Sequence, residues 1–255
     1  MTPQQNTKTL TVGSLFSGVG GLDLGLERAG LRVMWQSENN PYASRVLTKH
    51  WSETPNYGDI KTIDWHNVER PNIICGGYPC QPFSQTGQRA GHQDERHLFP
   101  WMLDAISTLR PDYAIMENVK GHLSLGGLTV IAELAAIGYV SEWCVIPAAA
   151  LGAPHKRERL VIVSYPYSVE LGQQRSTEDP RPTDCRRVFD GAREAIDGIG
   201  QWWQTQPQLD RVANGVPHRV DRLRGLGNAV VPQLGELIGK LILQHHTANN
   251  HDTPT

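Results

Sequence analysis

The sequence predicts an α/β fold with a doubly wound, mostly parallel sheet and a small irregular insert. Short apolar runs that suit buried strands alternate with segments whose apolar residues recur at helical spacing. Polar or glycine-rich loops follow several of these runs, at the edge where open α/β sheets place their ligands. The chain has 255 residues, of which 39% are hydrophobic, so it can form one full domain of this kind and a small second one.

This alternation gives the expected elements in order along the chain. Strands are expected at residues 9–16, 31–38, 73–76, 113–117, 139–146 and 160–165. Helices are expected at residues 20–29, from residue 41, at 98–109, at 131–137 and at 232–245. Gly30 would close the first helix and Pro41 would open the second, because each residue type is favoured at that position.

The bulk composition narrows the class of protein. The net charge of −2 gives no overall basic field, although a local basic stripe would be enough to bind a nucleic acid. The four cysteines form no CxxC pair and no Cys/His zinc spacing, so we expect no metal site. No secretion signal and no apolar stretch of about eighteen residues is seen, so we expect a cytoplasmic protein with free thiols.

The periodic pattern is lost between Pro166 and Arg224. This stretch holds nine arginines, no lysine, nine acidic residues and the adjacent pair Trp202 and Trp203. It is typical of a small irregular insert that recognises a ligand through arginines and turns. An amphipathic helix then returns from Pro232, and the polar tail after His246 is expected to be disordered.

A glycine-rich turn, FSGVGG at residues 16–21, joins the first strand to the first helix. Its glycines permit a tight turn and a close approach of the backbone to a ligand, although the turn alone is equally consistent with a plain connection. Glu38 ends the next strand about twenty residues later, where an acid can accept both ribose hydroxyls, or could instead cap the following helix. Asp59 and Ile60 would suit an adenine ring, but by themselves indicate only a turn.

Cys80 follows a buried strand and lies between Pro79 and a long polar loop. The flanking prolines and polar residues argue against a buried structural cysteine and favour a nucleophile on a mobile active-site loop. Glu117 follows the next apolar run, where it is either a satisfied acid at the edge of the core or a partner of the thiol. Partial burial would raise its pKa and keep a proton available for a ring nitrogen. A thiol, a carboxylate and a nucleotide-type loop suggest cofactor-dependent covalent chemistry on an electrophilic ring.

Two further motifs are ambiguous by themselves. Arg157 and Arg159 would point the same way in an extended segment and could hold a phosphate and steer a ring, although a solvated charged turn is the ordinary explanation. The GLGN segment at residues 225–228 reads as a loop that opens the final helix, and could equally be only a turn and an N-cap.

With these motifs in order, the chain resembles the DNA (cytosine-5) methyltransferases of prokaryotic or phage type. The resemblance extends from Leu15 to about Ile242. Its most specific motifs are FSGVGG at 16–21, PCQPFS at 79–84, ENV at 117–119, RER at 157–159 and GNAV at 227–230. The resemblance implies the class I methyltransferase fold, the cofactor S-adenosyl-L-methionine and a double-stranded DNA substrate.

The resemblance also implies a mechanism and a set of site residues. The thiolate of Cys80 would attack carbon 6 of a flipped-out cytosine, and Glu117 would stabilise or protonate nitrogen 3. Arg159 would hold the base and support Glu117. Arg157 would serve the backbone or the catalytic loop. The implied cofactor-binding residues are Phe16, Ser17, Gly18, Val19, Gly20, Gly21, Leu22, Glu38, Asn39, Asp59, Ile60, Pro79, Asn228, Ala229 and Val230. The implied DNA contacts are Gln81, Ser84, Arg89, Arg175, Arg181, Arg186, Arg187 and Arg193.

The sequence departs from the family pattern in three places. His155 stands where the family often has glutamine, the insert is short, and the charge of the insert is balanced rather than basic. We therefore expect a catalytic and cofactor-binding domain at residues 9–165, a small target-recognition region at 166–206 and a return to the catalytic domain at 207–245. The tails at 1–8 and 246–255 are expected to be disordered.

Three other functions are consistent with parts of this pattern. A tRNA cytosine-5 methyltransferase would use the same chemistry, a non-catalytic nucleic-acid binder could keep the fold, and an enzyme acting on free cytosine or uracil nucleotides would also use a cysteine on carbon 6. The filled reactive positions disfavour the second, and the arginine-rich insert disfavours the third. We expect a monomer that acts away from membranes, alone or beside a cognate restriction endonuclease with no physical complex.

Overall fold

The structure is a computed structural model, and it describes residues 9–79, 98–167 and 219–251. The strands are β1 (Thr11–Leu15), β2 (Arg32–Ser37), β3 (Ile73–Gly76), β4 (Tyr113–Val119), β5 (Tyr139–Pro147) and β6 (Glu158–Pro166). The α-helices are α1 (Gly21–Arg28), α2 (Pro41–His50), α3 (Phe99–Leu109), α4 (Leu128–Ala136), α8 (Arg219–Asn228) and α9 (Pro232–His251). Short helical turns lie at η1 (Ile60–Thr62), η2 (Trp65–Asn67), η3 (Leu123–Gly127) and η4 (Ala148–Leu151).

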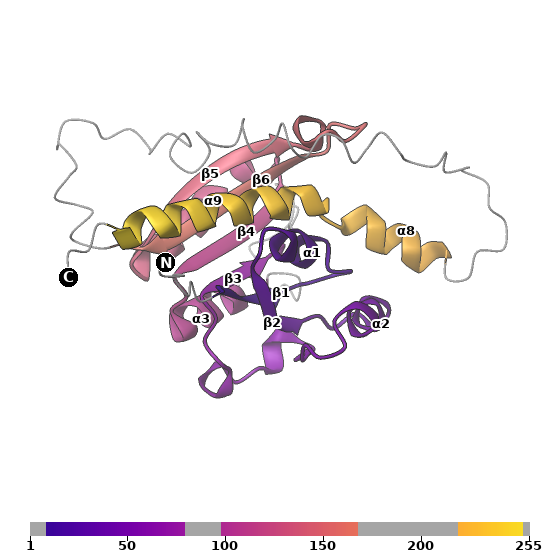
Figure 1. The fold of residues 1–255 in the computed structure, drawn as a ribbon, viewed down its shortest axis with the longest axis horizontal. Coiled ribbons are helices and arrows are strands. Elements are labelled where there is room, and N and C mark those ends of the chain that lie inside the picture. Colours follow the sequence, from indigo (N-terminus) through magenta and orange to yellow (C-terminus); the bar gives the residue numbers. More distant parts are fainter. Residues whose placement is uncertain (1–8, 80–97, 168–218, 252–255) are drawn as a thin grey trace, which may run out of the picture.

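The described strands form one sheet in the order β2-β1-β3-β4-β6-β5 (Figure 1). β1 pairs in parallel with β2 and β3, and β3 pairs in parallel with β4. Only β6 runs against its neighbours β4 and β5 among these strands. The predicted α/β fold with a mostly parallel sheet is confirmed. Because the chain goes from β1 outward to β2 and then back to β3, the carboxyl ends of β1 and β3 flank a topological switch point, where such sheets bind ligands.

Helices cover both faces of the sheet, and each face has its own apolar core. On one face, Val12, Ile73 and Ile115 pack with Leu26 of α1 and Ile238 of α9. On the other face, the neighbouring strand residues pack with α3 and α4, which contribute Met102, Ile106 and Leu134 among others. In Figure 1, α9 crosses in front of β4, β5 and β6, with α1 beside it. Adjacent residues of a strand serve opposite cores, as expected for a sheet buried on both sides.

A close contact between α1 and α9 fixes the final helix on the sheet. A Cβ added to Gly25 would collide with the carbonyl oxygen of Pro232 and lie 2.7 Å from the Cα of Gly235. A Cβ added to Gly235 would lie 2.6 Å from the carbonyl oxygen of Leu22. Two glycines therefore let the two backbones approach more closely than any other residue type would permit.

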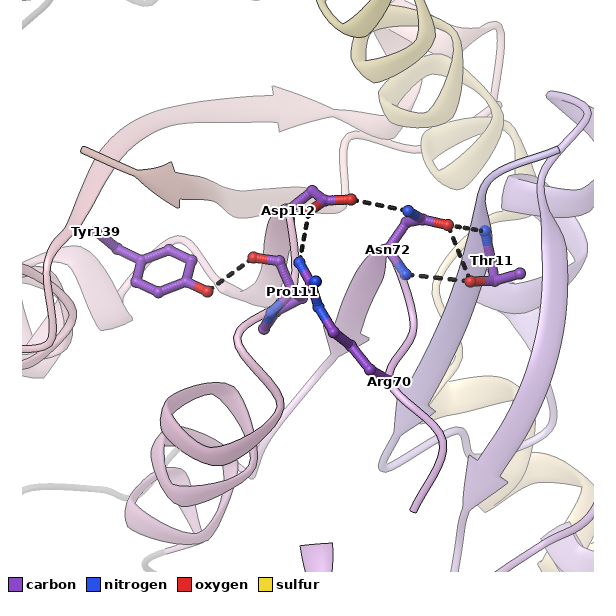
Figure 2. A network of polar contacts seen from close by, with 6 residues as sticks. All are labelled: Thr11, Arg70, Asn72, Pro111, Asp112 and Tyr139. Atoms are coloured by element: carbon purple, nitrogen blue, oxygen red, sulfur yellow. Dashed lines mark hydrogen bonds and ion pairs between the residues drawn. The ribbon is translucent and has the colours of Figure 1, made fainter. Parts of the chain in front are cut away.

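A network of polar contacts joins the amino ends of the central strands (Figure 2). The Oδ1 atom of Asn72, just before β3, accepts hydrogen bonds of 3.0 Å from the backbone N–H and the hydroxyl of Thr11. The Nδ2 atom of Asn72 donates to Asp112 over 2.8 Å, and Arg70 pairs with the same carboxylate over 2.7 Å. Tyr139 donates to the carbonyl of Pro111 over 2.7 Å. These bonds hold the edge of the sheet that lies opposite the carboxyl ends of the parallel strands.

Helix ends follow the sequence at the first two helices. Gly30 has a φ of +99° directly after α1 and its C-cap, as the prediction of a closing glycine requires. Pro41 is the first residue of α2, and Asn40 caps that helix by accepting hydrogen bonds from the N–H groups of Tyr42 and Ala43.

Two expectations about the C-terminal part are wrong. Residues 246–251 continue α9 instead of belonging to a disordered tail. Contacts beyond the apolar stripe hold this end, because the hydroxyl of Tyr113 lies 2.9 Å from Nδ1 of His245 and the rings of Tyr113 and His246 are 6.2 Å apart. Residues 225–228 are the last turn of α8 rather than a loop, and residues 219–224 are helical as well. Gly225 permits this, since a Cβ there would lie 3.1 Å from Val19 of the glycine-rich turn.

The described helices include none that is both long and apolar enough to cross a membrane.

We predict that Gly25→Ala lowers the free energy of unfolding by roughly 1–3 kcal/mol, because the added methyl group must push α9 away from α1. Urea denaturation of the purified protein measures this change. Gly121→Ala is the matched control, since a Cβ there meets nothing within 4 Å. Equal unfolding midpoints for the two variants would contradict the proposed role of the close contact.

Candidate functional site

A cavity of about 590 Å³ opens at the carboxyl ends of β1, β2, β3 and β4. It lies at the switch point of the sheet, between the glycine-rich turn and the residues that precede α9. The residues named from the sequence that line it are Phe16, Ser17, Gly18, Val19, Gly21, Leu22, Glu38, Asn39, Asp59, Ile60, Pro79, Glu117, Arg159, Asn228, Ala229 and Val230. Residues that are far apart in the sequence thus meet in one cavity.

The glycine-rich turn is held in a tight, left-handed conformation. Phe16, Gly18 and Gly20 have φ values of +54°, +56° and +81°. The hydroxyl of Ser17 donates to the carbonyl of Ser14 over 3.1 Å, so the turn is tied back to β1. A Cβ on Gly21 would collide with the carbonyl of Val230, which brings the segment before α9 directly against the turn. The side chain of Phe16 borders the cavity even though its backbone region favours glycine.

Glu38 fixes the turn to the end of β2. Its Oε2 accepts a 2.8 Å hydrogen bond from the N–H of Gly18, and its Oε1 accepts a 2.7 Å bond from the N–H of Asn40. Glu38 is not the helix cap, because Asn40 has that role. Each carboxylate oxygen keeps acceptor capacity toward the cavity, since it has a second lone pair.

A second acidic group lies beside Glu38. Asp59 caps the turn η1, because its side chain accepts a hydrogen bond of 3.0 Å from the N–H of Lys61. The amide of Asn39 reaches the other oxygen of Asp59 over 3.4 Å. Ile60 is buried next to it and presents an apolar surface to the cavity. One side of the cavity therefore combines two carboxylates with an apolar wall.

A buried ion pair lies on the other side of the cavity. The guanidinium Nε of Arg159 is 2.7 Å from Oε1 of Glu117, and the two side chains are 16% and 9% exposed. Glu117 lies within β4 rather than after it. Burial raises the pKa of Glu117, while the charges of Arg159 and Arg157 lower it. A Cβ on Gly77 would lie 2.8 Å from Oε2 of Glu117, so the backbone that leads toward Cys80 passes close to this carboxyl group.

The backbone at Arg157 is not extended, so the condition under which Arg157 and Arg159 would point the same way is not met. Arg157 has a φ of +26° and precedes the first residue of β6, which breaks the alternation of an extended segment. Its guanidinium Nη2 donates to the carbonyl of Ala229 over 3.0 Å. Arg157, His155 and Gly20 line a second, adjoining cavity of about 460 Å³, whereas Arg159 lines the first.

Asp23 borders the first cavity although the sequence analysis did not single it out. It accepts 2.6 Å hydrogen bonds from the hydroxyl of Ser14 and from the amide of Gln36, so it joins α1 to β1 and β2. Burial raises the pKa of Asp23 to about 6, against the opposing effect of these two donors. The signal was present, because Asp23 lies next to Leu22 at the start of an otherwise apolar helix face.

Asp221 of α8 and Tyr42 of α2 also line the cavity. The spacing of Asp221, Gly225 and Asn228 places them on one helix face, which would have predicted their proximity had the segment been recognised as helical. The remaining predicted site residues lie outside the described part of the chain: Cys80, Gln81, Ser84, Arg89, Arg175, Arg181, Arg186, Arg187 and Arg193. Within the described ranges, no group of three or more His, Cys, Asp or Glu side chains could hold a metal ion.

Comparison with known proteins identifies the family. Residues 10–206 match the family model of the C-5 cytosine-specific DNA methylases. The chain belongs to the C-5 cytosine-specific DNA methylase family. It is 36% identical over 156 residues to the type II methyltransferase M.NgoBI of Neisseria gonorrhoeae, a match that covers 59% of this chain and 49% of that protein. It is 33% identical over 201 residues to M.NgoFVII of the same organism, with 74% and 53% covered.

The chain spans about half the length of these curated C-5 methylase relatives. Solved structures support the fold. A putative DNA modification methyltransferase encoded within a prophage of E. coli matches with a TM-score of 0.64 at 17% identity, over 94% of this chain and 100% of that one. The Entamoeba histolytica methyltransferase EhMeth matches with a TM-score of 0.60 at 14% identity, over 94% and 99%. The resemblance that the motifs indicated is therefore confirmed at the level of family and fold.

We predict that the stability of the protein falls as the pH rises from about 4 to about 6, by an amount that Asp23→Asn removes. The folded-state pKa of Asp23 is raised from 3.8 to about 6, so its contribution is fully present below pH 3.8 and is lost as the pH rises through 6. A shift of this size corresponds to about 3 kcal/mol. Urea unfolding of both proteins at several pH values measures the difference, and parallel pH curves would contradict the assignment.

Proposed function

We propose that the protein is a DNA (cytosine-5) methyltransferase that uses S-adenosyl-L-methionine as methyl donor and works through a covalent adduct of Cys80. One observation carries the proposal. The Glu117–Arg159 ion pair and Glu38, which holds the glycine-rich turn through the N–H of Gly18, line the same cavity. Family membership supports the same reaction. Methyl transfer to a base requires a group that activates the base beside a surface that binds the nucleotide-like methyl donor.

The cavity residues fit the methyl donor. Glu38 offers free lone pairs to the ribose hydroxyls, and Asp59 with the buried Ile60 offers an acceptor and an apolar face to adenine. The ring of Phe16 borders the same space, where an aromatic face suits a positively charged sulfonium. Asn228, Ala229 and Val230 close the cavity from the opposite side. When bound, S-adenosyl-L-methionine supplies an electrophilic methyl group.

The thiolate of Cys80 adds to carbon 6 of a cytosine that has been turned out of the duplex. The addition pushes electrons into the ring, and Glu117 gives a proton to nitrogen 3, or a hydrogen bond, to neutralise that charge. Burial favours the protonated carboxyl that this step needs. Arg159 holds the Glu117 carboxyl in place through their 2.7 Å contact and also borders the base side of the cavity. After carbon 5 has been methylated and has lost its proton, the Cys80 thiolate leaves, nitrogen 3 returns its proton to Glu117, and the ring becomes aromatic again.

The remaining assignments rest on the same proposal. Double-stranded DNA is the proposed substrate, with Gln81, Ser84 and Arg89 as contacts in the loop and the arginines of residues 166–206 as base or phosphate contacts. Arg157, which donates to the carbonyl of Ala229, would support the donor side rather than touch the base. A DNA substrate would place the enzyme in the cytoplasm, and we propose that it acts as a monomer, alone or beside a cognate restriction endonuclease.

We predict that the wild-type chain methylates cytosines in one short sequence context when it is expressed in a methylation-deficient bacterium, and that Cys80→Ser abolishes this. Serine keeps the size of the side chain but lacks the nucleophilic thiolate. Genome-wide cytosine-methylation sequencing reads both results. Methylation by Cys80→Ser at the wild-type level would contradict the covalent mechanism. Absence of genomic methylation from folded wild-type protein would instead favour an RNA substrate or a binding-only protein.

We predict that Glu38→Ala weakens binding of S-adenosyl-L-methionine by roughly ten- to a hundredfold, because hydrogen bonds to a carboxylate contribute about 1.5–3 kcal/mol. Isothermal titration calorimetry measures the dissociation constant. Glu53→Ala removes an exposed carboxylate outside the cavity and serves as the control. If the two variants bind the donor equally well, Glu38 has no part in the ribose contact.

A further inference from the structure

A buried tyrosine and histidine pair lies beside the cavity and has no part in the roles assigned above. The hydroxyl of Tyr78 is 2.8 Å from Nε2 of His122, and the two residues are 4% and 5% exposed. Their rings meet edge to face with centroids 5.4 Å apart. Tyr78 lies between Gly77 and Pro79, two residues before Cys80 in the sequence. His122 lies after β4, directly before η3.

The hydrogen bond between Tyr78 and His122 restrains both side chains more than packing would, because both groups are polar and buried. Packing alone would need no hydroxyl at position 78, and a buried hydroxyl without a partner costs free energy. Burial lowers the pKa of His122, which favours the neutral imidazole as its partner. A hydroxyl and a neutral imidazole can each donate to the other, so the contact satisfies both groups in either arrangement. The bond therefore adds a directional restraint where an apolar contact would leave the ring free to slide.

The backbone of Tyr78 is held from the same strand that carries Glu117. The Nδ2 atom of Asn118 donates to the carbonyl of Tyr78 over 3.1 Å, and both groups are buried. The preceding Gly77 lies so close to the Glu117 carboxyl that a Cβ would be 2.8 Å from its Oε2. The segment that enters the Cys80 motif thus runs against the end of β4, where the Asn118 side chain holds its main chain, and His122 holds the Tyr78 side chain just after β4.

A third contact joins Tyr78 to α3. The rings of Tyr78 and Phe99 have centroids 5.1 Å apart, and Phe99 is the first residue of α3. Tyr78 therefore meets the elements that carry Phe99, Asn118 and His122, and these contacts converge on one side chain and its carbonyl.

We propose that Tyr78 and His122 are a positioning pair that fixes the backbone entering the Cys80 motif relative to Glu117. The inference rests on the proposed function, since it assigns the pair to the placement of the nucleophile. Addition of the thiolate to carbon 6 and proton transfer from Glu117 act on one ring, so the two groups need a fixed separation. A misplacement of about 1 Å can cost about a hundredfold in rate. Binding of the methyl donor is less sensitive to this distance, because most of its proposed contacts come from the glycine-rich turn, Glu38 and Asp59 on other elements.

The test compares Tyr78→Phe, His122→Leu and the double variant with the wild type. We expect each single variant to lower the single-turnover rate of methyl incorporation into unmethylated bacterial genomic DNA by about tenfold. The double variant should be no slower than the singles, because either change already breaks the bond. The dissociation constant of S-adenosyl-L-methionine should stay within about twofold. His122→Gln should recover part of the rate, since its amide can still donate to the tyrosine hydroxyl.

Tyr113→Phe is the matched control. It removes a second, partly buried tyrosine–histidine contact, the 2.9 Å bond to His245, at the opposite edge of the sheet. Tyr113→Phe should lower the melting temperature about as much as Tyr78→Phe does, while leaving the rate of methyl incorporation unchanged.

The outcomes separate the inference from the proposed function. A wild-type rate in Tyr78→Phe, or equal rate losses in Tyr78→Phe and Tyr113→Phe, would overturn the positioning role and leave the proposed function standing. Additive losses in the double variant would overturn the pairing. Wild-type protein that binds S-adenosyl-L-methionine but incorporates no methyl groups into DNA would overturn the proposed function, and the inference with it.

Discussion

The close approach of the chain around the glycine-rich turn is the constraint on which the rest of the structure depends. Gly25 of α1 meets Pro232 at the start of α9, and Gly21 meets Val230, with no room for a side chain at either glycine. These contacts bring the last described helix back against α1. They also carry Asn228, Ala229 and Val230 into the cavity at the carboxyl ends of the strands. These close contacts thus complete both an apolar core and a binding surface.

Much of the site could be predicted because parallel strands bring the residues after them to one edge. Glu38 and Glu117 are far apart in sequence, yet each ends an apolar run, and both line the same cavity. Sequence spacing could not orient Arg157, because its positive φ ends the alternation of an extended segment. The helix α8 was missed because tertiary packing against Val19 tolerates glycines that lower intrinsic helix propensity.

The end of α9 shows the same limit of sequence patterns. Its last two turns have no apolar stripe, so the pattern gave no reason to extend the helix beyond residue 245. Edge-to-face contacts of Tyr113 with His245 and His246 fix the helix there instead. Contacts between aromatic and imidazole side chains from distant elements leave no periodic trace in the sequence.

The two buried carboxyl groups beside the cavity differ in the charge of their partners. Asp23 has only neutral donors, so burial dominates and raises its pKa to about 6. Glu117 has a guanidinium 2.7 Å away, and its pKa is still raised, because burial outweighs the charges of Arg159 and Arg157. An acid without a cation could drift away from a productive orientation, and a fully exposed pair would leave the carboxyl ionised. Burial together with Arg159 keeps the Glu117 carboxyl both oriented and able to hold a proton, which is the combination that proton donation to a cytosine ring demands.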